Sequence, residues 1–143
     1  MVENLFAPYS DWGLLILRIG IALIFFSHGW PKLNPHSDMK GISGVAGFFQ
    51  QMNIPFQRLS AWIVALLETV GAIALALGLV TRLLGLAFAF DMFVAITKAK
   101  IGMMKVPFSG QNGWDFEFAL LSAGLALMFT GAGDVSLDAL FGI

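Results

Sequence analysis

The feature that most constrains this chain is an apolar run, Leu14 to Leu33, that has an arginine inside it. At about 1.5 Å per residue, roughly 20 helical residues cross the ~30 Å hydrocarbon core of a bilayer. An arginine within such a run costs at least ~2.5–3.5 kcal/mol on insertion scales. Arg18 therefore needs an acidic partner, carbonyl groups or water. The run predicts a membrane helix with one polar face turned toward protein.

Composition supports the same conclusion. Of 143 residues, 58% are hydrophobic and only 12% are charged, whereas soluble domains carry about 25% charged residues. We therefore expect residues 1–143 to form a single membrane domain. The net charge of −1 gives no electrostatic reason to bind nucleic acid. The chain has no cysteine, which excludes disulfide and thiolate chemistry from its own residues.

Four apolar segments, at about 12–30, 60–79, 82–98 and 114–130, fit membrane spans. All four tryptophans fall at or near an end of one of these segments, as expected for residues at the membrane interface. The first loop contains apolar residues at spacings of three and four, which predict a short amphipathic helix at the membrane surface: Ile42, Val45, Phe48, Phe49 and Met52. The predicted fold is all-α, a four-transmembrane-helix bundle with a short amphipathic interfacial helix in the first loop.

Basic residues predict the orientation. Loops one and three share a side of the membrane and carry most of them: Lys32, Lys40, Arg58, Lys98, Lys100 and Lys105. Arg82 alone lies on the side that holds both termini. The positive-inside rule places the two basic loops in the cytoplasm. We therefore predict a multi-pass protein of the plasma (inner) membrane with both termini outside.

Several ionisable residues lie in or beside these spans, where apolar residues would insert at lower cost. Such residues are functional candidates by default, and we expect a polar cavity that opens toward loops one and three. The candidate ligand-binding residues are His28, Lys32, Glu68, Asp91, Lys98 and Glu117. Asp91 and Lys98 are seven residues apart, which places them on one helical face.

A structural interpretation competes with the functional one. Buried ion pairs can fix the register of helices, and Arg18 has two candidate partners, Asp91 and Glu68. We assign Arg18 and Arg82 to structural ion pairs. His28 has its own alternative, in which it only caps the carbonyl groups that end the first span.

The expected site is an apolar cavity with basic residues at its opening. His28 and Lys32 lie four residues apart at the end of the first span, so they rise from one face. Trp30 and Trp62 are candidate walls. This arrangement suits an anionic or carbonyl head group with an apolar tail, as in a quinone. Metal chemistry fits poorly, because the only histidines are His28 and His36 and no Glu-x-x-His pair occurs; we predict no metal site and no intrinsic cofactor.

Several sequence motifs resemble those of the DoxX family of small four-span membrane proteins. They are Leu17-Arg-Ile-Gly20, His28-Gly-Trp-Pro-Lys-Leu33, Phe48-Phe with Asn53-Ile-Pro55, the segment from Glu68 to Arg82, Met92-Phe-Val-Ala95, and the closing segment from Gly131 to Ala139. Asp134 departs from the pattern, since relatives often carry a basic residue there. The resemblance implies a membrane subunit like that of an archaeal thiosulfate:quinone oxidoreductase, or of complexes that handle thiol and oxidative stress.

Three functions follow as expectations, and whether the chain is itself an enzyme stays open. The first is a membrane subunit of a redox system that binds a quinone or a small sulfur oxyanion and supplies binding and proton transfer. The second is a proton-coupled small-molecule transporter. The third is a scaffold subunit without an activity of its own. The expected partners are the lipid bilayer and either other redox subunits or further copies of the chain.

Overall fold

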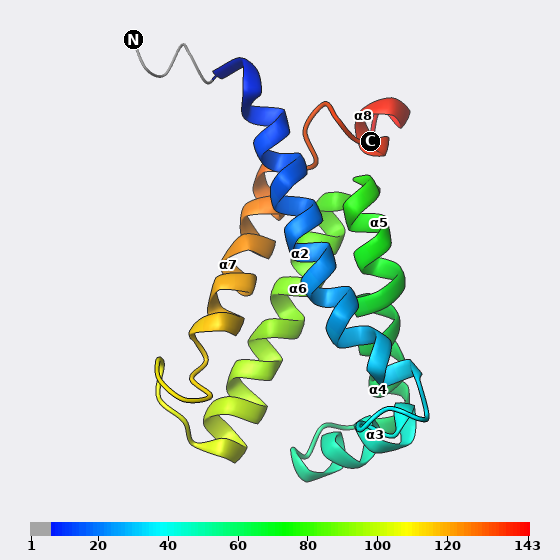
Figure 1. The fold of residues 1–143 in the computed structure, drawn as a ribbon, viewed down its shortest axis with the longest axis vertical. Helices are drawn as coiled ribbons and strands as arrows, with labels where there is room; N and C mark the ends of the chain where they lie inside the picture. Colours follow the sequence, from blue (N-terminus) through cyan, green and yellow to red (C-terminus); the bar gives the residue numbers. More distant parts are fainter. Residues whose placement is uncertain (1–6) are drawn as a thin grey trace.

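The computed structural model describes residues 7–143, and within that range it is helical, with no strand (Figure 1). The elements are η1 (Ala7–Tyr9), α2 (Ser10–Leu33), α3 (Gly41–Gln51), α4 (Gln57–Leu66), η2 (Leu67–Gly71), α5 (Ala72–Leu77), α6 (Thr81–Val94), η3 (Ala95–Met104), α7 (Asp115–Thr130) and α8 (Leu137–Phe141). Elements η2 and η3 are π-helical and continue α4 and α6 without a break. Residues 7–143 therefore contain four long helical rods, a short helix in the first loop and another near the C-terminus.

The rods form two pairs. α2 packs against the continuous helix α4–η2–α5, and α6 packs along α7 (Figure 1). The pairs lie close together at the end that carries the termini and diverge toward the opposite end. Two glycines allow α6 and α7 to touch: a Cβ added at Gly85 would lie 2.6 Å from the carbonyl oxygen of Gly124. Small residues that let backbones approach are typical of membrane helix packing.

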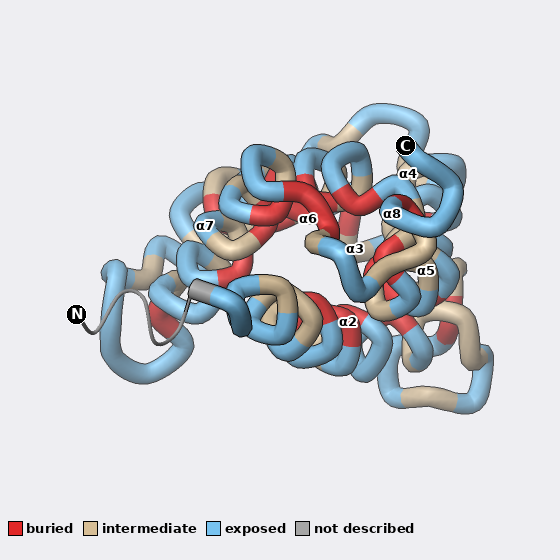
Figure 2. The backbone as a smooth tube through the Cα atoms, turned by 90° about the horizontal axis from the view of Figure 1, so that it is seen from above, coloured by how far each residue is buried: buried red, intermediate tan, exposed pale blue. Residues whose placement is uncertain are grey.

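The buried residues of α2, α5 and α6 lie on the sides of these helices that face one another, while the outer sides are exposed (Figure 2). Within this core the rings of Phe25 and Phe88 stack with centroids 4.1 Å apart. The outer faces carry large apolar side chains, for example Ile16 at 71% exposure, Leu23 at 66% and Phe90 at 65%. Exposed apolar area of this extent calls for an apolar environment. A membrane provides it.

The four rods lie where the sequence predicts spans, each differing from the predicted bounds by only a few residues, except that η3 extends the third one to Met104. Two of them, Ser10–Leu33 and Gln57–Leu77, are long and apolar enough to cross a membrane by length and composition. That the other two also cross stays a prediction. The amphipathic helix predicted in the first loop is present as α3, which buries Val45 and Phe49.

Candidate functional site

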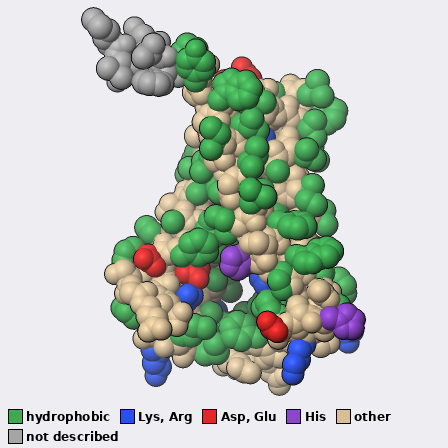
Figure 3. Space-filling view, in the orientation of Figure 1, with side chains coloured by type: hydrophobic (Ala, Val, Ile, Leu, Met, Phe, Trp, Pro, Cys, Tyr) green, Lys and Arg blue, Asp and Glu red, His purple; other side chains and the backbone are tan. Residues whose placement is uncertain are grey.

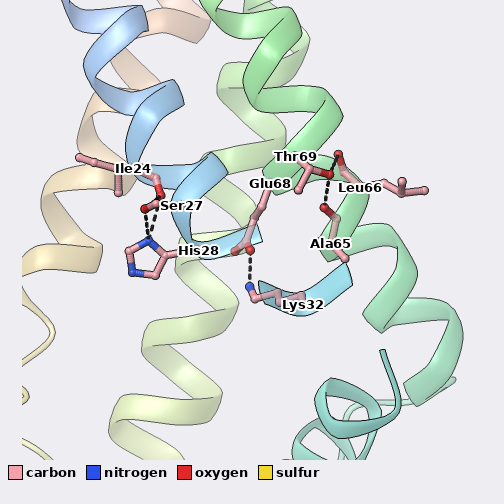
Figure 4. Close-up of polar contacts among 8 residues, drawn as sticks. All are labelled: Ile24, Ser27, His28, Lys32, Ala65, Leu66, Glu68 and Thr69. Atoms are coloured by element: carbon pink, nitrogen blue, oxygen red, sulfur yellow. Dashed lines mark hydrogen bonds and ion pairs between the residues drawn. The ribbon is translucent and has the colours of Figure 1, made fainter. Parts of the chain in front are cut away.

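A buried ion pair joins α2 to the second rod. The Lys32 ammonium donates to Oε2 of Glu68, and the two side chains are 15% and 4% exposed (Figure 4). Gly29, one turn before Lys32, makes the approach possible, since a Cβ there would lie 2.6 Å from the Cβ of Glu68. Glu68 belongs to η2, a π-helical turn of the kind often found at functional sites.

Asp91 on α6 completes this group. It lies close enough to Glu68 and Lys32 to interact with both. Its Oδ2 atom is buried and has no hydrogen-bond partner in the described structure. Two carboxyl groups therefore surround one ammonium group between the helix pairs.

A second ion pair lies where η3 meets α7. The Lys100 Nζ is 3.1 Å from Oε1 of Glu117 and also donates to the carbonyl groups of Asn112 and Gly113, at 3.1 and 3.2 Å. The Oε2 atom of Glu117 is buried without a partner. Sequence reasoning placed Lys100 only in the orientation argument. The sequence gives one indication of this role: only a short loop separates Lys100 from the start of α7, so the two can meet.

Lys98 does not join the site. It is exposed and forms no ion pair among residues 7–143, contrary to the expectation that it shares a face with Asp91. The physical reason is η3: from Ala95 onward the helix has π geometry, with more residues per turn. The 100° step on which that expectation depended therefore stops four residues after Asp91.

His28 lies on the flank of α2 that faces α7, away from the Lys32–Glu68 pair (Figure 4). Its Nδ1 is 2.8 Å from the carbonyl oxygen of Ile24 and 3.3 Å from the Ser27 hydroxyl oxygen. Its ring centroid is 6.2 Å from that of Phe116. His28 thus contacts a helix carbonyl, as the capping alternative predicts, yet its other nitrogen is left for a second contact.

These groups lie around a hollow. Figure 3 shows it in the half of the molecule away from the termini, with a histidine and charged side chains of both signs at its rim. It occupies the space where the helix pairs diverge. The structure forms two charged groups, one of Lys32, Glu68 and Asp91 and the other of Lys100 and Glu117, and it places His28 beside Phe116. We call the six residues His28, Lys32, Glu68, Asp91, Lys100 and Glu117 the charged cluster. Trp30 and Trp62 are 56% and 44% exposed, and their assignment as walls stays a prediction.

Arg18 does not form the predicted ion pair with an acidic residue. It is fully buried, and within residues 7–143 no carboxylate lies within ion-pair distance of it. Its guanidinium donates to the carbonyl of Val135 in the C-terminal segment. Asp138 interacts electrostatically with Arg18, but the carboxylate of Asp138 accepts from the amides of Val80 and Thr81. The partner was missed because carbonyl groups of a distant segment leave no mark in the sequence.

Arg82 also binds carbonyl groups and not an acid. Its guanidinium donates to Met128 at 3.0 Å and to Phe129 at 2.6 Å, at the end of α7. The last carbonyl groups of a helix lack partners within the helix and attract cations. Arg82 therefore anchors the C-terminus of α7 to the start of α6. No ion pair is formed by Arg82 among the residues that the structure describes.

The described residues contain no group of three or more side chains suited to hold a metal ion. A bundle with an apolar exterior, two helices long enough to cross a membrane and a charged hollow is the design of an integral membrane protein. Comparison with known proteins agrees and is more specific. The DoxX family profile matches residues 13–101, and the chain belongs to the DoxX family.

Two relatives are similar over most of their length. The first is "Putative oxidoreductase CatD" of Bacillus subtilis (strain 168), 32% identical over 126 residues, which cover 88% of this chain and 84% of that one. The second is "Inner membrane protein YphA" of Escherichia coli (strain K12), 32% identical over 143 aligned positions, which cover 91% and 95%. No solved structure matches the chain. The family and the second relative support a membrane location.

Proposed function

We propose that this protein is a four-span inner-membrane subunit of a redox system, with loops one and three in the cytoplasm. It binds a small aromatic ligand of the quinone type in the hollow between the helix pairs. The chain supplies the binding site and exchanges protons, and electrons pass through partner subunits. The name of the relative in Bacillus subtilis, an oxidoreductase, supports the redox assignment.

The observation that carries the proposal is the group formed by Lys32, Glu68 and Asp91. Ionisable groups at membrane depth are costly and mark ligand or proton pathways. An ion pair that only holds two helices together needs one cation and one anion, with every polar atom hydrogen-bonded. Here a second carboxyl group lies beside the pair with a buried oxygen unpartnered. Such an atom in a native structure calls for a ligand or a water.

The position of this group favours binding over a scaffold role. It borders a hollow, and its Glu68 lies in the π-helical segment η2 of the second rod. The opposite end of the molecule is closed by contacts from the C-terminal segment to Arg18 and to the start of α6. Access from one side suits a binding subunit, whereas a transporter needs a path at both ends.

The test is a titration of the detergent-solubilised protein with a short-tailed benzoquinone. Tryptophan fluorescence or calorimetry monitors the binding. We expect saturable binding that is weakened in the His28→Ala, Lys32→Ala double variant by about 0.5–1.5 kcal/mol, the effect of at least one hydrogen bond. The Asp115→Asn variant is the control, because Asp115 is exposed and has no cationic partner in the described structure. Equal affinity in wild type and a folded double variant would contradict the site.

A further inference from the structure

A second cavity lies at the end of the molecule where α6 begins and α7 ends (Figure 1). Its volume is about 390 Å³, and its walls are the first turn of α6, the last residue of α7 and the C-terminal segment. Small-molecule sites commonly measure about 300–1,000 Å³. No residue of the charged cluster lines this cavity. The proposed function therefore leaves it unexplained, and we call it the polar cavity.

Two opposite charges line the polar cavity, and in the described structure they do not pair. Arg82 comes from α6 and Asp134 from the C-terminal segment, and both residues are exposed. The other acid in the wall, Asp138, is already occupied, because its carboxylate accepts from the amides of Val80 and Thr81. The polar cavity thus offers one cationic and one anionic group to a ligand that carries both charges.

The guanidinium group of Arg82 keeps hydrogen-bond donors for such a ligand. A guanidinium group has five N–H donors in a fixed planar arrangement. Nη1 uses its two donors on the carbonyl groups of Met128 and Phe129, and Nη2 lies 3.4 Å from the carbonyl oxygen of Thr130. Among residues 7–143, Nε and the second N–H of Nη2 have no acceptor. These two donors lie side by side, and such a pair suits two oxygens of one phosphate group.

An apolar groove lies along the same pair of helices. Its volume is about 230 Å³, and only apolar residues line it: Leu86, Ala89, Phe90, Phe93, Leu121 and Leu125. Leu83 in the wall of the polar cavity is three residues before Leu86, so the two share a face of α6. Phe90 and Phe93 continue this face at spacings of four and three, and all four side chains are exposed. A head group in the polar cavity can therefore extend an apolar chain into the apolar groove.

We propose that the polar cavity and the apolar groove together bind one phospholipid with a zwitterionic ethanolamine head group. Its phosphate accepts hydrogen bonds from Arg82, its ammonium group donates to Asp134, and one acyl chain lies in the apolar groove. A glycerol head group brings no cation for Asp134, which repels its phosphate. A choline head group has the positive charge but no N–H donor. This site is separate from the hollow of the proposed function, so either one can fail without the other.

The experiment measures lipid binding to the full chain, freed of lipid in detergent, by native mass spectrometry. The probes are phosphatidylethanolamine, phosphatidylcholine and phosphatidylglycerol with identical dioleoyl chains. We expect phosphatidylethanolamine to bind about three- to fivefold more tightly than either of the others, the effect of one exposed ion pair. Free phosphoethanolamine at the same concentration should not displace it, because the free head group lacks the acyl chain that buries apolar area in the groove.

Asp134→Lys should remove this preference. Asp115→Lys is the matched control and should keep it, because it makes the same change of charge at an exposed position at the opposite end of α7. Arg82→Gln should weaken the binding of all three lipids, since each of them carries the phosphate. Thermal unfolding in lipid-free detergent identifies any variant that fails to fold. Should Arg82→Gln fail to fold, the comparison of Asp134→Lys with Asp115→Lys still decides the question.

Four outcomes would overturn the proposal. Equal binding of the three lipids to the wild type would show contact with bilayer lipid and no specific site. Tightest binding of phosphatidylglycerol, or a preference for phosphatidylethanolamine that persists in folded Asp134→Lys, would contradict the contact between the ammonium group and Asp134. Displacement by free phosphoethanolamine would assign the polar cavity to a soluble ligand. The quinone titration is independent of all four outcomes.

Discussion

At the scale of single residues, Gly29 and Glu68 together decide how closely α2 approaches the second rod. A side chain at Gly29 would occupy space that the backbone and Cβ of Glu68 already fill, at 2.6 to 2.8 Å. The buried pair between Lys32 and Glu68 is held by this approach. Steric and electrostatic effects at this contact can be measured separately.

Replacing Gly29 by alanine should destabilise the bundle by about 1–3 kcal/mol, the usual cost of inserting a methyl group into a packed interface. The matched control is Gly20→Ala in the same helix, where an added Cβ meets nothing within 4 Å. There the change should be neutral or slightly stabilising, because alanine is the better helix former. Reversible unfolding in mixed micelles would measure both, and equal stability of the two variants would contradict the contact.

Replacing Glu68 by glutamine should leave the Lys32 ammonium without its paired carboxylate. Breaking a buried pair costs about 3–5 kcal/mol in soluble proteins, and we expect a loss near about 3 kcal/mol because Asp91 also lies close to Lys32. The same unfolding assay applies, with Asp115→Asn as an exposed control. A loss within about 0.5 kcal/mol would show that the ammonium is already solvated in the hollow.

At the scale of elements, the C-terminal segment closes one end of the bundle. The Asp138 carboxylate accepts from the amides of Val80 and Thr81, so it caps the start of α6 from outside that helix. The Asp138 amide in turn donates to the carbonyl of Gly78 at 2.8 Å. The segment also supplies the carbonyl that Arg18 binds. The turn between α5 and α6 is therefore fixed by residues almost 60 positions later.

Asp138→Ala should destabilise the protein by about 0.5–2 kcal/mol, as the loss of a helix N-cap does. Asp138→Asn should cost less, since the amide oxygen keeps one acceptor. Asp134→Ala is the matched control in the same segment, because Asp134 is exposed and its backbone amide, not its side chain, makes the contact with Asp11. Thermal unfolding of the three variants would check the order, and similar melting of Asp138→Ala and Asp134→Ala would contradict the cap.

At the scale of the whole molecule, the two ends differ in chemistry. The end with the termini is closed by Arg18, Arg82 and Asp138 through backbone groups. The opposite end diverges and holds the charged cluster around a hollow. The basic loops lie at this open end, so the proposed orientation turns the hollow toward the cytoplasm.

Cysteine labelling would test this orientation without interference, because the natural chain has no cysteine. Ser43→Cys in α3 and Asp134→Cys near the C-terminus both replace exposed residues. We expect a membrane-impermeant maleimide to label Asp134→Cys in intact cells and Ser43→Cys only after lysis. Labelling of both from one side would contradict four spans, and the inverse pattern would reverse the orientation alone.

The sequence by itself determined the parts that depend on local patterns. Apolar length, tryptophan positions and spacings of three and four were enough for the four rods and for α3, because these signals act within one segment. It also marked Lys32, Glu68, Asp91 and Glu117 as candidates, since an ionisable residue in an apolar run is visible without knowing its partner. That they bind a ligand stays a prediction.

Only the tertiary structure decided which of these groups meet and what they leave unpaired. Lys98 turned outward because η3 departs from α-helical geometry, which depends on packing between rods. Arg18 and Arg82 bind backbone carbonyls of the C-terminal segment and α7, and a carbonyl carries no identity in the sequence. The pairing of Lys32 with Glu68 and of Lys100 with Glu117 appeared for the same reason, because pairing is a property of three-dimensional contact.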